Sequence, residues 1–200
     1  MREQSILLQI MKQRSELDNY GEPNAPSPLE RVGVRSQITP LPCGEEVRGR
    51  LRAIFPGTFD PFTIGHYDIV MRGLQLFDDI VIGVGVNQAK KTYFSTEKRI
   101  NIIHQAFKNE PRVKVQEYNS LTVTFAKMVN AGFILRGLRS VNDFEYERTV
   151  ADANKYLSGG VETVILNTDP RYSYISSTVV RDLLIFGHDI SHFLPPGVTL

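Results

Sequence analysis

Five short apolar segments, each followed by a stretch with helical spacing, occupy the chain from residue 50 onward. The clearest of them is residues 79–86, Asp-Ile-Val-Ile-Gly-Val-Gly-Val, a continuous run of the kind that is buried on both faces of a parallel sheet. The other four segments are residues 52–55, 113–118, 133–135 and 162–167. Because strands that alternate with helices are typical of a sheet covered on both faces, we expect an α/β fold with a doubly wound, five-stranded parallel sheet.

The helices expected between these strands have recognisable ends. Ser95 has the side chain of an N-cap residue, and the helix after it would bury Ile100, Ile103, His104 and Phe107. Glycine, which readily ends a helix, follows each of the later helical stretches. These stretches are residues 121–131, 142–158 and 177–186, followed by Gly132, Gly159 and Gly187.

The first strand leads into a turn and a helix start that together suit an anion. Gly57 and Gly65 allow a phosphate to approach the backbone closely, and His66 lies where apolar residues begin to recur at helical spacing. A helix N-terminus has unpaired backbone N–H groups and a partial positive charge. The imidazole and these amides could therefore face one phosphate together.

Composition limits the partners and the compartment. A chain of 200 residues suits one well-buried domain, and its formal charge of +1 gives no general attraction to nucleic acid or to an anionic membrane, so we expect neither as a partner. No apolar run approaches the roughly 20 residues that span a bilayer. The single cysteine, Cys43, excludes an internal disulfide and suits the reducing cytoplasm, where we expect the protein.

The first 49 residues differ from the rest of the chain. They hold five of the eleven prolines, and the tract after Tyr20 is too poor in apolar residues to order itself. Apolar residues near the start could form one face of a short helix. We therefore expect residues 1–49 to be a largely disordered extension with a possible short helix, and residues 50–200 to form the functional domain.

Basic and hydroxyl side chains follow three other predicted strands. Lys90 lies one short loop after the strand 79–86, whereas its neighbour Lys91 is interpreted as solvated. Arg136 directly follows the strand 133–135, in a position that suits bidentate recognition of a phosphate. Three hydroxyl residues, Ser176, Ser177 and Thr178, precede the last helix; capping explains one of them, and the group also suits an anion.

Several other kinds of site are excluded by spacing. Gly83-Val84-Gly85 lacks the third glycine of a dinucleotide-binding turn, and no Gly-Lys-Ser/Thr phosphate loop occurs. His104, His188 and His192 are scattered, so they have no neighbours for a metal site or a catalytic triad. We interpret them as structural histidines and expect no dedicated protein ligand for a metal.

Four motifs occur in an order that resembles a known family. Residues 57–61, Gly-Thr-Phe-Asp-Pro, followed by Thr63-Ile64-Gly65-His66, resemble the T/HxGH signature of the nucleotidyltransferase superfamily, in the variant found in phosphopantetheine adenylyltransferases. Residues 136–139, 143–147 and 175–178 resemble the later motifs of that family. The resemblance implies a Rossmann-like nucleotidyltransferase fold.

The resemblance also implies a reaction. Members transfer the adenylyl group of ATP, with Mg²⁺, to 4′-phosphopantetheine, giving dephospho-coenzyme A and pyrophosphate in coenzyme A biosynthesis, and they form homohexamers. A related enzyme with another phosphorylated acceptor would keep Thr58 and His66 but need not keep Lys90 or residues 143–147. A nucleotide-binding module without catalysis would tolerate the loss of His66, which this chain retains.

Residue roles follow only by matching motif to motif. The resemblance assigns catalysis to His66, as transition-state stabiliser, and to Thr58, Lys90 and Arg139. It assigns binding of the acceptor to Thr58, Lys90, Thr122 and Arg136. It assigns ATP binding to Thr58, Phe59, His66, Gly137, Leu138, Arg139, Glu147, Tyr172, Ser173, Tyr174, Ile175, Ser176, Ser177 and Thr178. Serine is commoner in the family than Thr178, which keeps the hydroxyl group.

Overall fold

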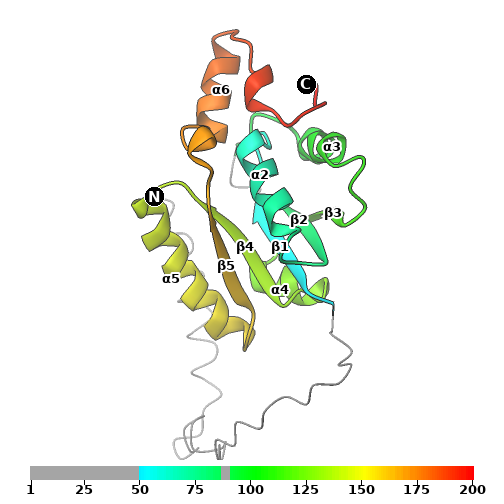
Figure 1. Ribbon diagram of the computed structural model, residues 1–200, viewed down its shortest axis with the longest axis vertical. Helices are drawn as coiled ribbons and strands as arrows, with labels where there is room; N and C mark the ends of the chain where they lie inside the picture. Colours follow the sequence, from blue (N-terminus) through cyan, green and yellow to red (C-terminus); the bar gives the residue numbers. More distant parts are fainter. Residues whose placement is uncertain (1–49, 87–90) are drawn as a thin grey trace, which may run out of the picture. The chain divides into compact units, whose positions relative to one another are not determined.

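The structure is a computed structural model that describes residues 50–86 and 91–200. Within these residues five parallel strands form one sheet in the order β3-β2-β1-β4-β5 (Figure 1). The strands are β1 (Arg52–Gly57), β2 (Asp79–Gly85), β3 (Val113–Tyr118), β4 (Phe133–Leu138) and β5 (Glu162–Asn167). The predicted α/β fold with a five-stranded parallel sheet is therefore confirmed. The predicted extension, residues 1–49, lies outside the described residues.

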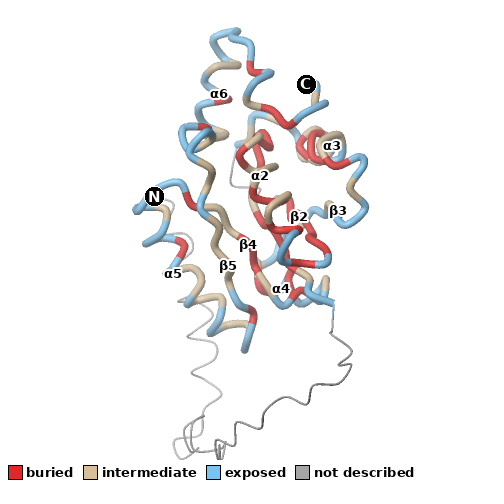
Figure 2. Tube along the Cα trace, viewed as in Figure 1, coloured by how far each residue is buried: buried red, intermediate tan, exposed pale blue. Residues whose placement is uncertain are grey.

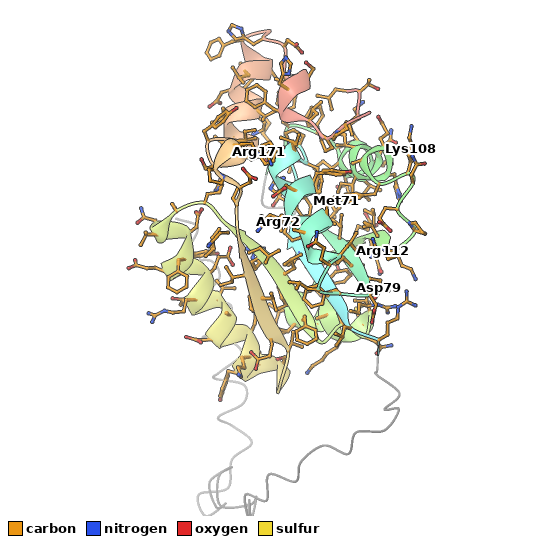
Figure 3. The ribbon with its side chains drawn as sticks, in the orientation of Figure 1. Met71, Arg72, Asp79, Lys108, Arg112 and Arg171 are labelled. Atoms are coloured by element: carbon orange, nitrogen blue, oxygen red, sulfur yellow. The ribbon has the colours of Figure 1, made fainter. Side chains whose placement is uncertain are left out.

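A helix follows each strand. These helices are α2 (Ile64–Gly73), α3 (Thr96–Ala106), α4 (Thr122–Met128), α5 (Val141–Ser158) and α6 (Ser177–Ile185). Two short 3-10 turns, η2 (Pro170–Tyr172) and η3 (Ser191–Phe193), flank α6. Arg72 on α2 donates to the carbonyl of Asn167 at 2.8 Å, which ties α2 to the end of β5 (Figure 3 labels Arg72).

Helices cover both faces of the sheet. Successive residues of a strand point to opposite faces, so each face has its own set of side chains for these helices to pack on. Ala53 and Phe55 of β1 pack with Ile69 of α2 and Ile103 of α3 in one core cluster. The intervening residue, Ile54, packs with Phe125 of α4 in a second cluster. The two clusters make the sheet doubly wound, and Figure 2 shows β1 and β2 as mostly buried.

Several predicted boundaries were wrong. The strand predicted at 52–55 continues to Gly57. The strand predicted at 133–135 continues to Leu138, so Arg136 and Gly137 lie inside β4 instead of after it. The helix predicted at 121–131 ends at Met128, and Asn130, with φ of 53°, takes the left-handed turn that we expected of Gly132. The N–H of Ala131 bonds back to the carbonyl of Ala126 at 2.9 Å, a helix ending that asparagine can also make.

The ligand-binding edge is defined by the strand order. The connections reverse direction between β1 and β4, and in an open parallel sheet the crevice at such a reversal lies at the carboxyl ends of the strands. Gly57 at the end of β1 and Leu138 at the end of β4 therefore border the expected crevice. The helix α2 starts at this edge, seven residues after Gly57.

Candidate active site

His66 occupies the third position of α2, where it closes the N-terminus of the helix. The backbone N–H of Thr63 donates to His66 Nδ1 at 3.0 Å, and the Thr63 hydroxyl oxygen also lies 3.0 Å from this nitrogen. A backbone N–H can only donate, so Nδ1 must accept. The neutral ring therefore carries its proton on Nε2, which leaves an N–H donor available for a ligand.

The surroundings of His66 keep it neutral. Three phenylalanine rings pack around the imidazole, with centroids 5.2 Å (Phe59), 5.3 Å (Phe62) and 6.2 Å (Phe55) away. Burial lowers the pKa of His66 to about 4, and the positive charges of Arg139 and Arg136 add to this effect. The effect of their charges indicates that both arginines lie near His66. At neutral pH His66 is thus a hydrogen-bond donor and not a base.

The ionisation of His66 gives a direct test of this state. We expect the ring in the full-length protein to stay neutral, as the Nε2–H tautomer, when the pH falls from 8 to 5, because its pKa is about 4. Nitrogen-15 NMR of the imidazole measures both the tautomer and the titration. The unfolded chain takes up this proton near pH 6.5, whereas the folded chain does so only near pH 4. As the pH falls from 6.5 to 4, protonation of His66 therefore favours the unfolded chain and lowers the free energy of unfolding. Titration of the His66 ring near pH 6.5 in the native protein would contradict the assignment.

The turn between β1 and α2 has a compact conformation. A Cβ at Gly57 would lie 2.7 Å from the ring of Phe59, so only glycine fits beneath this ring. Phe59 itself has φ of 51°, in the left-handed region that non-glycine residues rarely adopt. The ring of Phe59 is buried against Phe55 and Phe62. Thr58 is half-buried between Gly57 and Phe59.

Arg136 connects the end of the sheet to α5. Its Nε and Nη2 atoms donate to the two carboxylate oxygens of Glu147 at 2.7 and 2.5 Å, and its Nη1 donates to the carbonyl of Pro56 at 2.7 Å. Glu147 is the buried residue of α5. The two residues were predicted as separate contacts for acceptor and ATP, and the structure brings them together as one bidentate ion pair.

The remaining residues of the arginine motif have distinct surroundings. A Cβ at Gly137 would lie 3.0 Å from Ile69, so glycine lets α2 pack closely on β4. Leu138 is buried. Arg139 is 42% exposed and lies 3.4 Å from Asp143, and its charge acts on His66 as described above. Of the two arginines, Arg139 is the one with the more accessible guanidinium.

The hydroxyl-rich segment before α6 reaches the turn after β1. Ser176 caps α6 by accepting from the N–H of Val179 at 3.2 Å, and Ser177 donates its hydroxyl to the carbonyl of Pro61 at 2.9 Å. A Cβ at Gly65 would lie 3.6 Å from Tyr172, so this segment packs against the start of α2. The N-termini of α2 and α6 are therefore neighbours, and both present backbone N–H groups.

The other residues of this segment differ in exposure. Ser173 donates to the carbonyl of Pro170 at 3.0 Å, and Ile175 is buried in a cluster with Val180. Tyr174 is 67% exposed, with its ring edge-on to Phe193. Ile175 can therefore offer a ligand only its backbone.

Two predicted residues remain, Thr122 and Lys90. Thr122 begins α4, after β3, which lies two positions from β1 in the sheet. Lys90 lies outside the described residues. Thr122 is thus at the same edge of the sheet but at the side away from β4.

Three residues of the region were missed from the sequence. Asp60, which is buried, accepts from the N–H groups of Tyr93 and Phe94 at 2.7 and 2.8 Å. Arg181 on α6 donates to the carbonyl of Asp60 at 2.7 Å, and Arg99 on α3 donates to that of Thr58 at 2.6 Å. Asp60 lies within the first motif, residues 57–61, and Arg181 follows the hydroxyl residue Thr178 by one helical turn and donates to it. Arg99 had no such local signal.

Within residues 50–86 and 91–200, no three His, Cys, Asp or Glu side chains are grouped closely enough to hold a metal ion. The helices of the same residues all lack the combination of length and apolar character needed to cross a membrane.

The fold and a family model define the class of protein. Residues 54–183 match the family model described as cytidylyltransferase-like, which places this domain among the nucleotidyltransferases. Two solved structures share the fold. A putative nicotinate-nucleotide adenylyltransferase from Vibrio parahaemolyticus has a TM-score of 0.51 at 19% identity, covering 74% of this chain and 95% of that one. A bifunctional NMN adenylyltransferase/ADP ribose pyrophosphatase from Francisella tularensis has a TM-score of 0.55 at 16% identity, covering 73% and 44%.

Sequence relatives identify the family within this class. The phosphopantetheine adenylyltransferase of Phocaeicola vulgatus is 56% identical over 149 residues, which make up 74% of this chain and 98% of the relative. That of Bacteroides fragilis is 54% identical over 149 residues, with 74% and 99% covered. The chain belongs to the phosphopantetheine adenylyltransferase family, as its motifs predicted.

Proposed function

We propose that this chain transfers the adenylyl group of ATP to 4′-phosphopantetheine, giving dephospho-coenzyme A and pyrophosphate, a step of coenzyme A biosynthesis. The observation that carries the proposal is the neutral state of His66 at the N-terminus of α2. The N–H of Thr63 bonds to its Nδ1, which leaves Nε2–H as a donor, and the nearby charges of Arg139 and Arg136 help to keep the ring neutral. The identity to phosphopantetheine adenylyltransferases supports the choice of acceptor.

The chemistry requires no base from the protein. A phosphate monoester has its second pKa near ~6, so its attacking oxygen is already anionic at neutral pH. A bond forms from that oxygen to the α-phosphorus of ATP, the bond from this phosphorus to the bridging oxygen breaks, and pyrophosphate leaves. The task left to the protein is to align two polyanions and to stabilise the charge that develops on the α-phosphate.

The residues divide between the two substrates. His66 Nε2–H and Arg139 would face the phosphates of ATP, with the N-terminus of α6 and residues 172–178 beside them. Thr58 would face both substrates, and Lys90, Thr122 and Arg136 would face the acceptor. Because Arg136 and Glu147 form one ion pair, the sites for acceptor and ATP would share a structural element.

Further properties come from the family resemblance. Mg²⁺ would arrive with ATP and would help to neutralise the charge of its phosphates. We propose a homohexamer in the cytoplasm, with the two small molecules as substrates and neither nucleic acid nor membrane as partner. The single cysteine suits that compartment.

A substrate panel tests the proposal. Purified full-length protein is incubated with ATP, Mg²⁺ and one of several phosphorylated acceptors, including nicotinamide mononucleotide, and pyrophosphate release is measured. We expect release with 4′-phosphopantetheine at a rate far above the others. Preference for a different acceptor would indicate a sister nucleotidyltransferase, and absence of release with all of them would indicate a binding module.

Lys90 and its neighbour form a matched pair of variants. We expect Lys90→Ala to raise the KM for 4′-phosphopantetheine about tenfold or more, with little change in the KM for ATP. An ammonium contact to the phosphate of the acceptor stabilises the bound substrate as well as the transition state, so its loss weakens binding. Lys91→Ala, the control, should leave both values unchanged, because Lys91 is exposed. Steady-state kinetics, with each substrate varied in turn, measures both KM values for the two variants. An effect on ATP alone would assign Lys90 to the other substrate.

A further inference from the structure

Arg99 is an arginine buried inside the domain, on α3. Only 2% of its surface is exposed, although arginine is among the residues least often buried without a partner. No carboxylate forms an ion pair with it within the described residues. Its environment therefore calls for an explanation other than a salt bridge.

The guanidinium of Arg99 bonds to backbone oxygens at the ends of two neighbouring strands. Nη1 donates to the carbonyl of Thr58 at 2.6 Å and to that of Gly85 at 3.3 Å. Nη2 donates to the hydroxyl of Thr96, at the start of α3, at 2.8 Å. Since β1 pairs with β2 in register up to Gly57 and Val84, these two carbonyls come directly after the last paired residues. Arg99 thus links the carboxyl ends of both strands to α3.

The position of Thr58 depends on this contact. The turn after Thr58 is held by Arg181 at the carbonyl of Asp60 and by Ser177 at that of Pro61. These two contacts lie beyond Phe59, whose left-handed backbone changes the direction of the chain. The contact from Arg99 is made to the carbonyl of Thr58 itself, so it acts on the peptide unit next to the side chain that we assign to both substrates.

We propose that Arg99 is a positioning residue for Thr58: its guanidinium holds the Thr58 carbonyl against the end of β2, so that the Thr58 hydroxyl is aligned with the reacting phosphates. The inference rests on the proposed function, in which Thr58 binds both substrates. Arg99 touches neither substrate, and it acts through the backbone.

The cost of burying Arg99 favours this role over packing alone. Its Nε–H has no partner among the described residues, and a buried donor without a partner is destabilising. Burial lowers the pKa of Arg99, and the nearby carboxylate of Asp60 acts in the opposite direction. An apolar side chain would fill this space without the unpaired donor, but it could not donate to the carbonyls of Thr58 and Gly85.

The reduction in kcat that follows from a misaligned Thr58 can be estimated. Displacing a substrate-contacting group by about 1 Å can reduce turnover about 100-fold, because a well-oriented geometry supplies much of the rate. The remaining contacts from Arg181 and Ser177 limit the displacement. We therefore expect Arg99→Met to reduce kcat by about 10-fold to 100-fold.

The test is a double-mutant cycle in the full-length protein, with Thr58→Val, Arg99→Met and the double variant, measuring kcat for pyrophosphate release. If Arg99 acts through Thr58, the two single losses are not multiplied, and the double variant has nearly the kcat of Thr58→Val alone. Arg52→Met is the control, because Arg52 also donates to a backbone carbonyl, that of Val129, but lies at the amino end of β1. This variant should lower the thermal midpoint and leave kcat per folded protein unchanged.

Each other outcome overturns a specific part. Arg99→Met with normal kcat, or a double variant whose loss is the product of the single losses, would overturn the role of Arg99 while leaving that of Thr58 intact. Normal kcat in Thr58→Val would overturn the proposed role of Thr58 and the inference with it. Should Arg99→Met fail to fold, Arg99→Lys replaces it in the same cycle, since it keeps a buried charge and one short donor but not the bridging fork.

Discussion

Replacing His66 by alanine is expected to lower kcat by at least about 100-fold and to leave the KM for ATP within a factor of about three. The reason is that the Nε2–H donor strengthens its bond as charge develops on the phosphate, so it contributes more to the transition state than to binding. The pKa of about 4 keeps this proton in place throughout the neutral range. Steady-state kinetics with ATP and 4′-phosphopantetheine measures both parameters.

The control for His66 is a change that keeps a donor. Glutamine carries an N–H at roughly the reach of Nε2, so His66→Gln should recover part of the lost kcat. Because Nδ1 also accepts from the N–H of Thr63, His66→Ala should lose some stability, whereas the amide oxygen of His66→Gln can accept the same bond. Equal kcat in the alanine variant and the parent would exclude His66 from catalysis.

Replacing Glu147 by alanine is expected to lower the free energy of unfolding by about 2–3 kcal/mol. Glu147 accepts two hydrogen bonds from Arg136, and the side chain of Glu147 is 11% exposed. Removing it leaves the guanidinium without its counter-charge, and breaking such a pair when fully buried costs about 3–5 kcal/mol. We expect less here because the side chain of Arg136 remains 26% exposed and water can reach it. Urea unfolding measures the change.

A matched ion pair on the surface serves as the control for Glu147. Lys155 and Glu162 lie 2.5 Å apart but are 60% and 52% exposed, so Glu162→Ala should cost less than about 1 kcal/mol. Glu147→Ala should also reduce activity, because Arg136 would lose the orientation that two bonds impose. A stability loss no larger than that of Glu162→Ala would show that the pair contributes little to the fold.

The order of strands and helices could be predicted because each element has its own local signal. After Asp79 the run to residue 86 is apolar throughout, and a strand buried on both faces requires this pattern whatever lies beside it. Gly159 and Gly187, with φ of 72° each, follow α5 and the C-cap of α6 as predicted. The end of α4 could not be predicted in the same way, since Asn130 and Gly132 are both able to adopt the left-handed turn and only packing decides between them.

The face of α3 shows where local patterns fail. Helical spacing predicted that His104 would be buried, and this prediction was wrong: His104 is exposed, whereas Ile102 and Arg99 are buried. A charged side chain in a helix is ordinarily solvated, so nothing near Arg99 in the sequence indicates burial. Its partners, the carbonyls of Thr58 and Gly85, are 41 and 14 residues away and meet it only in the folded chain.

In the candidate site, too, the positions of the residues could be predicted but the partners of their side chains could not. The motifs located the turn, the arginines and the hydroxyl residues at one edge of the sheet, because all of them follow or end parallel strands. The partners of these side chains could not be predicted. The fork between Arg136 and Glu147 and the bond from Ser177 to Pro61 depend on how α5 and α6 pack, which no spacing in the sequence records.

The mass of the product tests the central claim most directly. The protein is incubated with ATP and Mg²⁺ together with 4′-phosphopantetheine or with pantetheine, which lacks the phosphate, and the products are analysed by mass spectrometry. The account predicts dephospho-coenzyme A and pyrophosphate from the phosphorylated compound alone, because only a phosphate oxygen is anionic enough at neutral pH to react without a base. An adenylylated product from pantetheine, or none from 4′-phosphopantetheine, would contradict it.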